Sequence, residues 1–526
     1  DPANPDHRAE IAALWGVDSV PSVPGLPAVA MFDAIGQGKI KAVWIACTNP
    51  AQSLPNQAAV REALQAAEYV VLQEAYRNTD TSDYADLLLP ASAWGEKQGT
   101  VTNSERCITR VFPAITAPGE ARHDWEIVVD FARRLGRKLD HASASHLFPY
   151  EDVESIFNEH RESTRGRDLD ITGLSYPLLA SRGPQQWPFP EGASSGKVRL
   201  YEDARFPSSD GKARFVRIEH QATADQLVAD YPLSLLSGRM RDHWHGMSRT
   251  GTVPRLFNLE DEPMLAMHSC DMRHRGLETG DFVKVSNPRG NVVLRVAETA
   301  GLKKGRAWLP MHWGSQYMNS AGFNALACDA IDPYSNQPEL KHAAVQLTRL
   351  DLPYPIAVIR RCAAQNEALE LLQKARRLLP DFAYASVGLY GRKRPLVVFR
   401  GATAQPVGDV VIAELDRLFE MDGEQGEILY VDARRQIAKK AIVLDGRLFG
   451  VRLAGEALAL AWLKQAMAED ELDSSLIRFA LAPSAKAPMS LAPRNIVCKC
   501  ADVSDRQIQQ ALDEGAGLPQ IQDALK

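Results

Sequence analysis

Apolar runs of strand length alternate with an amphipathic stretch near the start of the chain. Residues 42–47 and 69–72 are apolar, residues 57–67 carry apolar positions at helical spacing, and a further apolar run covers 85–89. This order predicts parallel βαβ units, whose ligands bind beyond the carboxyl ends of the strands. Asn49 follows the first strand and is therefore a candidate, although an Asn-Pro pair is also a common turn.

The pattern then becomes less regular. Residues 124–135 predict a helix capped by Asp124, with Trp125, Val128, Val129, Ala132 and Leu135 on its buried face. The stretch 137–220 is rich in Pro, Gly and Ser, with strand-like pieces at 197–201 and 213–218. The pattern of this stretch is mixed.

The second half of the chain contains shorter apolar runs and no internal repeat. Apolar runs separated by glycine turns predict strands of a small barrel at 233–236, 282–285, 292–296 and 307–309. A proline-rich linker follows at 350–355. Beyond it, the pattern predicts a small α+β unit with a helix at 365–379, a strand at 396–399, a hairpin around Asp445-Gly446 and a helix at 454–467.

Length and charge narrow the possible functions. A chain of 526 residues is expected to form about three or four domains. Its net charge of −6 argues against a general nucleic-acid binder, and no apolar run is long enough to cross a membrane. The seven cysteines, an odd number and mostly scattered, favour a reducing compartment. The start lacks Met and any export signal, so we expect the chain to begin inside a longer protein.

The segment from Ser237 to Thr250 carries the most chemistry. It combines a strand end with arginines, histidines and a tryptophan, which together suit a flat, polyanionic cofactor. A solvated basic loop is the alternative. Its candidate residues are Ser237 and Gly238 for close backbone approach to a phosphate, Arg239 for charge, His243, His245 and Thr250 as donors, and Trp244 for stacking or core packing.

A second segment, Trp94 to Arg106, contains two glycines and many short polar side chains. Gly99, Thr100, Asn103 and Arg106 are its candidate ligand contacts. A well-bonded surface loop is the alternative, in which Arg106 pairs with Glu96.

These two segments and a third, 324–341, resemble segments of the molybdopterin oxidoreductases that bind bis-molybdopterin guanine dinucleotide (bis-MGD), and they occur in the same order along the chain. Within that family, the segment 94–106 resembles the nitrate reductases. The resemblance covers roughly residues 30–350. It implies that Asn49 meets one dinucleotide and that the loop 94–106 lies along the pterins. It further implies that the pterin end is lined by His312, Trp313, Asn324 and Lys341. For Lys341, the alternative is an ordinary surface lysine.

The resemblance implies a multidomain α/β fold. We expect a partial Rossmann-like parallel domain over 1–150, a connecting segment over 151–225 and a six-stranded, double-psi-like dinucleotide-binding barrel over 226–352. A small α+β domain over 356–481 faintly resembles the C-terminal domain of flavin-linked NADH reductases. It lacks a Gly-x-Gly-x-x-Gly string, so we interpret it as a docking or spacing module.

The last segment, 495–526, contains Cys498-Lys-Cys500 before a helix with Ser504 as its N-cap. It resembles a bacterioferritin-associated ferredoxin-like [2Fe–2S] domain, which makes Cys498 and Cys500 candidate metal ligands. The second cysteine pair of that pattern is missing, so either the domain is truncated, which we favour, or the cluster is absent. The family's [4Fe–4S] site and molybdenum ligand have no counterpart in this sequence.

The sequence thus predicts the C-terminal portion of a cytoplasmic, assimilatory nitrate reductase, inactive as this fragment alone. Its electrons would come through iron–sulfur clusters from a reductase, ferredoxin or flavodoxin partner, with no nucleic-acid or membrane partner. One alternative is another enzyme of the superfamily, such as a formate dehydrogenase. Another is a non-catalytic chain that binds the cofactor or a redox partner.

Overall fold

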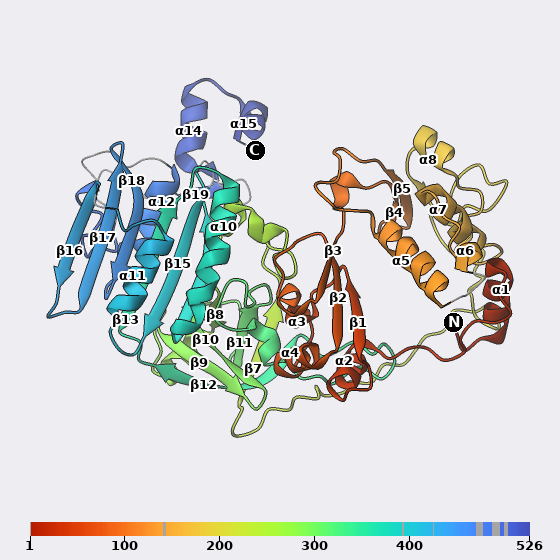
Figure 1. The fold of residues 1–526 in the computed structure, drawn as a ribbon, viewed down its shortest axis with the longest axis horizontal. Coiled ribbons are helices and arrows are strands. Elements are labelled where there is room, and N and C mark those ends of the chain that lie inside the picture. Colours follow the sequence, from red (N-terminus) through yellow and green to blue (C-terminus); the bar gives the residue numbers. More distant parts are fainter. Residues whose placement is uncertain are drawn as a thin grey trace.

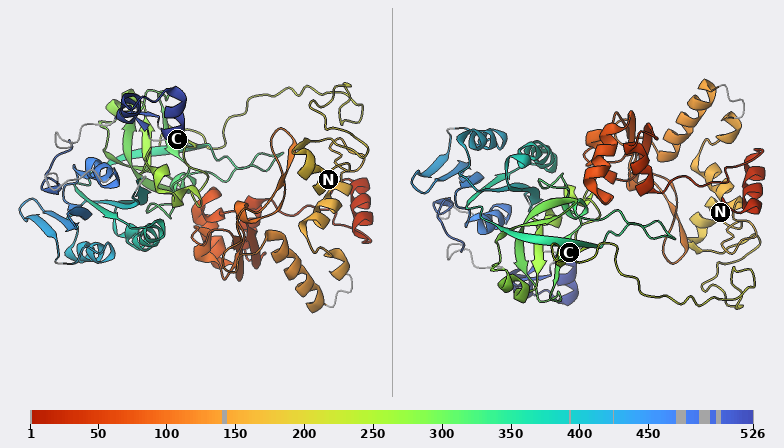
Figure 2. Two further views of the ribbon diagram at one scale, coloured as in Figure 1. Left: turned by 90° about the horizontal axis from the view of Figure 1, so that it is seen from above. Right: turned by 90° about the horizontal axis from the view of Figure 1, so that it is seen from below.

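A computed structural model describes residues 2–139, 144–391, 394–423, 425–469, 477–486, 495–498 and 503–525. Figure 1 shows a barrel and a large antiparallel sheet on one side, a helical lobe on the other, and a small parallel sheet between them. Figure 2 shows the long segment before the barrel running from the helical lobe back to the barrel. No helix among the described residues has the length and apolarity needed to span a membrane.

The parallel sheet has the order β1-β2-β3 and both pairs are parallel. Val43 and Ile45 of β1 pack against Val60 and Leu64 of the amphipathic helix α4. The predicted βαβ pattern is therefore confirmed. The elements of this part are α2 (Ala28–Gly36), β1 (Ala42–Ala46), α3 (Pro50–Ser53), α4 (Gln57–Ala66), β2 (Tyr69–Glu74), η1 (Thr81–Tyr84) and β3 (Leu87–Pro90).

The helical lobe contains a three-stranded sheet of order β4-β5-β6 covered by short helices. The predicted strands at 197–201 and 213–218 are wrong: both stretches are irregular, and Phe215 is fully exposed, because no strand of the described residues pairs with them. The elements are α1 (Pro5–Trp15), η2 (Trp94–Glu96), β4 (Gly99–Thr102), β5 (Cys107–Val111), α5 (Asp124–Lys138), α6 (Ala144–Leu147), α7 (Val153–Glu162), α8 (Tyr176–Arg182) and β6 (Gln185–Gln186).

Helix α5 differs in detail from the prediction. Its N-cap is His123, whose backbone N–H donates to the Glu126 carboxylate at 3.2 Å, so Asp124 is the first helical residue and not the cap. The helix buries Val129, whereas Val128 and Leu135 are exposed. Helical spacing identified two adjacent apolar stripes, and only the tertiary contacts decide which of them packs.

The closed barrel has six strands in the order β10-β8-β11-β7-β12-β9. Alternate residues of its strands, such as Val283, Val285, Val292 and Leu294, are buried at its centre. The predicted six-stranded barrel is confirmed. Its elements are β7 (Leu233–Gly238), η3 (Thr250–Thr252), η4 (Pro254–Phe257), β8 (Met264–Met267), α9 (Ser269–His274), β9 (Phe282–Asn287), β10 (Gly290–Glu298), β11 (Arg306–Pro310), η5 (Gly322–Ala325) and β12 (His342–Leu350).

A six-stranded antiparallel sheet follows, in the order β14-β15-β13-β18-β17-β16. The Asp445-Gly446 hairpin is confirmed, with both residues at positive φ. The predicted helix at 454–467 begins only at Leu460, because β18 extends to Ala454 and Gly455 turns the chain at φ 80°. The elements are β13 (Tyr354–Arg361), α10 (Gln365–Ala375), η6 (Arg376–Asp381), β14 (Tyr384–Tyr390), β15 (Leu396–Thr403), α11 (Asp409–Leu418), β16 (Glu427–Asp432), β17 (Ile437–Leu444), β18 (Arg447–Ala454) and α12 (Leu460–Glu469).

The C-terminal elements are β19 (Ile496–Cys498), β20 (Val503–Ser504), α14 (Asp505–Asp513) and α15 (Leu518–Leu525). Ser504 caps α14, as predicted, and Gln507 completes a capping box. Most of the predicted linker at 482–494 lies outside the described residues, as does Cys500.

Candidate cofactor site

The loops that follow β7 and β11 leave the barrel side by side. The two strands are parallel neighbours, with Gly238 level with Pro310. A Cβ on Gly238 would come within 2.7 Å of the Trp308 Nε1 atom, so close packing requires glycine here. The Ser237 hydroxyl donates to the Leu340 carbonyl at 2.7 Å. Both residues therefore fix the start of the first loop.

His312 joins the two loops. Its side chain is fully buried, its Nε2 accepts the Met240 N–H at 2.8 Å, and its Nδ1 donates to the His245 carbonyl at 2.7 Å. This arrangement requires a neutral ring protonated on Nδ1. Burial lowers the pKa of His312, which keeps the ring neutral. His312 thus holds the cofactor loops in place and does not itself supply charge.

His243 and Trp313 belong to the core. They are 4% and 2% exposed, and their rings meet edge to face at 5.6 Å. Burial lowers the pKa of His243 to about 4. The Thr250 hydroxyl lies 3.3 Å from His243 Nδ1 and accepts the Trp244 N–H at 3.1 Å. These contacts shape the loop from within.

Four basic side chains of the two loops lie near one another, since three of them act on the pKa of the fourth, His245. We call Arg239, His245, Arg249 and Lys341 the cationic cluster. Burial, followed by Arg239, Arg249 and Lys341, lowers the pKa of His245. Arg239, Arg249 and Lys341 are exposed, and none of them forms an ion pair with any part of the chain that the structure describes. The Arg239 guanidinium lies 4.6 Å from the ring centroid of Trp244, which is 46% exposed. The cluster therefore presents positive charge and an aromatic face to solvent.

Asn49 lies at the carboxyl end of β1 in the parallel sheet. Its Nδ2 donates to Gln52 and Asp80, both at 3.2 Å, and its Oδ1 accepts from the amide and the hydroxyl of Thr81. The side chain is therefore fully occupied in joining the turns after β1 and β2. Burial raises the pKa of Glu74 at the end of β2, whereas the N–H groups of Ala75 and Tyr76 and the charge of Arg249 lower it, so Arg249 lies near this end of the sheet.

Gln52 connects this sheet to the barrel loops, and the sequence did not single it out. It is 5% exposed, and its Nε2 donates to the His312 carbonyl at 2.8 Å. A Cβ on Gly246 would lie 1.7 Å from its Oε1, so the loop passes directly over this side chain. The Asn324 amide donates to the Gln52 carbonyl at 2.6 Å. The sequence signal for this close contact between Gln52 and the two loops is the pair of glycines, Gly246 and Gly314, that pack against its side chain.

The segment with Gly99, Thr100, Asn103 and Arg106 forms the β4–β5 hairpin in the helical lobe, apart from the barrel (Figure 1). Asn103 Oδ1 accepts the N–H groups of Glu105 and Cys107 within the turn. Arg106 donates to backbone carbonyls of Trp187, Lys197 and Val198 and not to Glu96. The structure thus does not bring these four residues beside the cationic cluster.

Among the described residues, no group of three or more His, Cys, Asp or Glu side chains is arranged to hold a metal ion. Cys498 lies in β19 and is half-buried. Its proposed partner Cys500 is outside the described residues.

Comparison with known proteins gives two family matches. Residues 4–134 match the model of molybdopterin oxidoreductase, and residues 233–344 match the model of the molydopterin dinucleotide binding domain. These ranges contain the parallel sheet with part of the helical lobe and most of the barrel, respectively.

The chain is also similar to curated proteins. It is 33% identical to a nitrate reductase of Klebsiella oxytoca over 98% of this chain and 57% of that protein. It is 34% identical to the assimilatory nitrate reductase catalytic subunit of Bacillus subtilis over 65% of this chain and 47% of that protein. A third relative, the F420-dependent formate dehydrogenase subunit alpha of Methanocaldococcus jannaschii, is 33% identical over 64% of this chain and 47% of that protein. The chain thus spans about half the length of these relatives.

Proposed function

We infer that the chain belongs to the molybdopterin oxidoreductases and that its cationic cluster binds the phosphates of a molybdopterin guanine dinucleotide. The observation that carries this inference is a group of basic side chains without ion-pair partners among the described residues, at the loops of a barrel that matches a molydopterin dinucleotide binding domain. Guanidinium and ammonium groups that lack carboxylate partners suit phosphate. The residues present therefore fit this group.

The geometry suggests different roles for the predicted residues. Arg239, Arg249 and Lys341 would neutralise phosphate charge, and the exposed Trp244 would cover a flat ring. His312, Asn49 and Asn324 would act indirectly, since their polar atoms already hold the loops. Gly99, Thr100, Asn103 and Arg106 stay predicted cofactor contacts. When bound, the cofactor would supply two-electron redox chemistry, while this chain would position it and limit access of water.

We propose nitrate as the substrate, reduced by two electrons to nitrite. Two of the relatives compared above are named as nitrate reductases, and one of these matches over almost all of this chain. Formate is the second candidate, because the third relative is named as a formate dehydrogenase subunit. A cytoplasmic location and electron delivery by a reductase, ferredoxin or flavodoxin belong to the same proposal, as does the loss of activity in this part alone.

The test is turnover by the full-length protein. We expect molybdenum-loaded enzyme to oxidise reduced viologen dye when nitrate is added, and to show no formate-dependent reduction of oxidised dye. The reverse pattern would favour the formate alternative. Absence of turnover with either, in protein that retains its molybdenum, would reject both substrates and leave the cofactor assignment standing.

We further propose that Cys498 and Cys500 ligate a [2Fe–2S] cluster, with [4Fe–4S] ligands elsewhere in the full protein. The support is the Cys-x-Cys pair next to a capped helix. In the full-length protein, Cys498→Ser should remove one [2Fe–2S] signal from the electron paramagnetic resonance spectrum of the reduced form. The matched variant Cys270→Ser, in a half-buried position of the barrel part, should keep it. An unchanged iron content in Cys498→Ser would contradict this assignment.

A further inference from the structure

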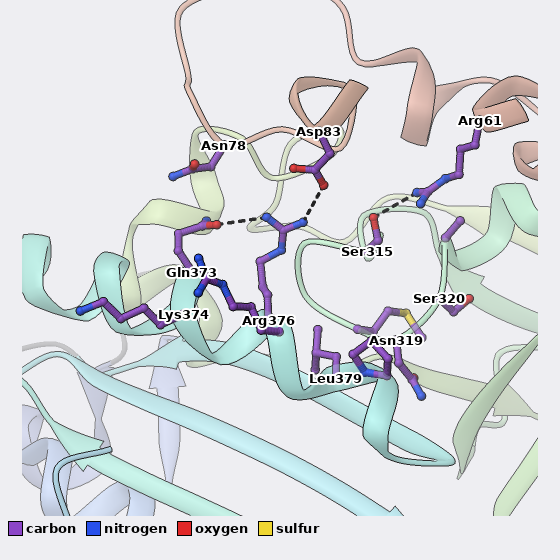
Figure 3. Close-up of a pocket in the computed structure, with 14 residues that line it drawn as sticks. Arg61, Asn78, Asp83, Ser315, Asn319, Ser320, Gln373, Lys374, Arg376 and Leu379 are labelled. Atoms are coloured by element: carbon purple, nitrogen blue, oxygen red, sulfur yellow. Dashed lines mark hydrogen bonds and ion pairs between the residues drawn. The ribbon is translucent and has the colours of Figure 1, made fainter. Parts of the chain in front are cut away.

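A separate cavity lies where three parts of the chain meet, and it encloses about 650 Å³. Figure 3 shows that its walls come from α4 and η1 of the parallel-sheet part, the loop after β11, and the turn of helix where α10 passes into η6. Its lining residues are not those of the cationic cluster. It is therefore a second site, with a different set of basic groups.

The cavity has an excess of positive charge. Arg376 pairs with Asp83 at 3.2 Å, and Arg61 lies 3.6 Å from the buried Asp80. The remaining two basic side chains, Lys374 and Arg377, are exposed, and within the described part of the chain neither forms an ion pair. Two positive charges thus remain uncompensated in a concave site, a combination that attracts anions.

One donor atom in the wall also lacks a partner. The Nε atom of Arg376 is buried and has no acceptor among the described residues. The same guanidinium is held in place by Gln373 at 3.1 Å and by Asp83, as the dashed lines in Figure 3 show. Arg376 is thus a preformed basic group at the wall, although its buried Nε is closed to the cavity.

The rest of the lining indicates the size and kind of ligand. It includes the amides of Asn78 and Gln373 and the hydroxyl of Ser320, but no aromatic ring on which a nucleobase would stack. We propose that this cavity binds a small polyvalent oxyanion, a di- or tricarboxylate or a phosphate compound, through Lys374, Arg376 and Arg377. Carboxylate and phosphate share the planar or forked acceptor geometry that these side chains recognise.

Such a ligand would connect the cavity to the cofactor loops. Ser315, in the cavity wall, accepts from Arg61 at 3.0 Å and donates to Asp80, and it lies three residues after His312. An anion held by α10 and η6 would therefore join the antiparallel-sheet part to the loop that His312 fixes. Because such an anion would bind the folded state and not the unfolded state, it should raise the thermal stability of the protein.

Isothermal titration calorimetry of the purified full-length protein with citrate and with pyrophosphate tests the proposal. Replacing both exposed cations, in Lys374→Gln/Arg377→Gln, should weaken binding by about tenfold or more, since charge-assisted contacts are lost. The matched control Lys303→Gln/Lys304→Gln, two exposed lysines in a turn outside the cavity, should bind as the unaltered chain does.

A third variant separates the two sites. Arg239→Ala/Lys341→Ala removes charge from the cationic cluster and should leave citrate binding at the cavity unchanged. The proposal is overturned if neither citrate nor pyrophosphate shows binding at anion concentrations up to about 10 mM, which would detect even weak affinity. It is equally overturned if the cluster variant abolishes binding while Lys374→Gln/Arg377→Gln does not. Because calorimetry requires neither molybdenum nor nitrate, failure here is distinguishable from failure of the proposed function.

Discussion

An Arg239→Ala/Lys341→Ala variant of the full-length protein should purify with less than about a tenth of the normal molybdenum content, because charge-assisted hydrogen bonds contribute about 1.5–3 kcal/mol each. The side chains belong to the cationic cluster and are exposed, so their removal leaves the barrel core unchanged. Molybdenum measured by mass spectrometry, together with GMP released from the denatured protein, reports occupancy directly.

The control for this variant is Lys303→Ala/Lys304→Ala, which removes two exposed basic side chains from a turn between β10 and β11. It should retain full molybdenum. Normal molybdenum in the cluster variant would refute the phosphate-binding role. A matching fall in both variants would show that basic charge in general, and not this cluster, governs loading.

The sequence was sufficient to predict the order of folding units. Apolar runs at strand length and helical spacing depend on local side chains, so the parallel sheet, the barrel and the Asp445-Gly446 hairpin could be predicted. The start of α12 was missed because β18 continues to Ala454, and that extension depends on pairing with β13 and β17. Strand pairing of this kind involves residues far apart in the sequence.

In the site, too, local features could be predicted from the sequence, whereas features that depend on distant contacts could not. Residue types correctly indicated a basic, aromatic loop, but they gave no means of separating the exposed Trp244 from the buried His243 next to it. Burial is set by distant residues such as Phe257 and Trp313. Gln52 was missed for the same reason, since its importance arises from contacts with the loop after β11, which lies about 260 residues away in the chain.

The antiparallel sheet is joined to the barrel by a largely buried ionic network, which its interpretation as a docking or spacing module did not specify. Asp261, just before β8, accepts from Arg400 of β15 and Lys464 of α12. Neighbouring Glu262 accepts from the Tyr384 hydroxyl at 2.8 Å. Burial alone would raise the pKa of Asp261, but Arg400 and Lys464 together lower it to about 2.

Asp261→Asn should therefore lower the free energy of unfolding by about 3 kcal/mol at pH 7, since it leaves the buried Lys464 without its ion-pair partner and Arg400 with only Glu262, 3.6 Å away. The carboxylate has a lower pKa in the folded chain than its ordinary 3.8, so its stabilising contribution is complete above pH 4 and declines as the pH falls toward 2. Urea unfolding of both proteins at pH 7, 5 and 3 should show a constant difference at the first two values and a smaller one at pH 3.

Asp230→Asn is the matched control, because Asp230 is exposed. It should change stability by less than about 0.5 kcal/mol. If Asp261→Asn were equally mild, the ion pairs of Asp261 would contribute little to holding the sheet against the barrel. The expected loss would instead mean that the sheet and the barrel respond as one body, so that an anion bound beside α10 acts on the same unit that carries the cofactor loops.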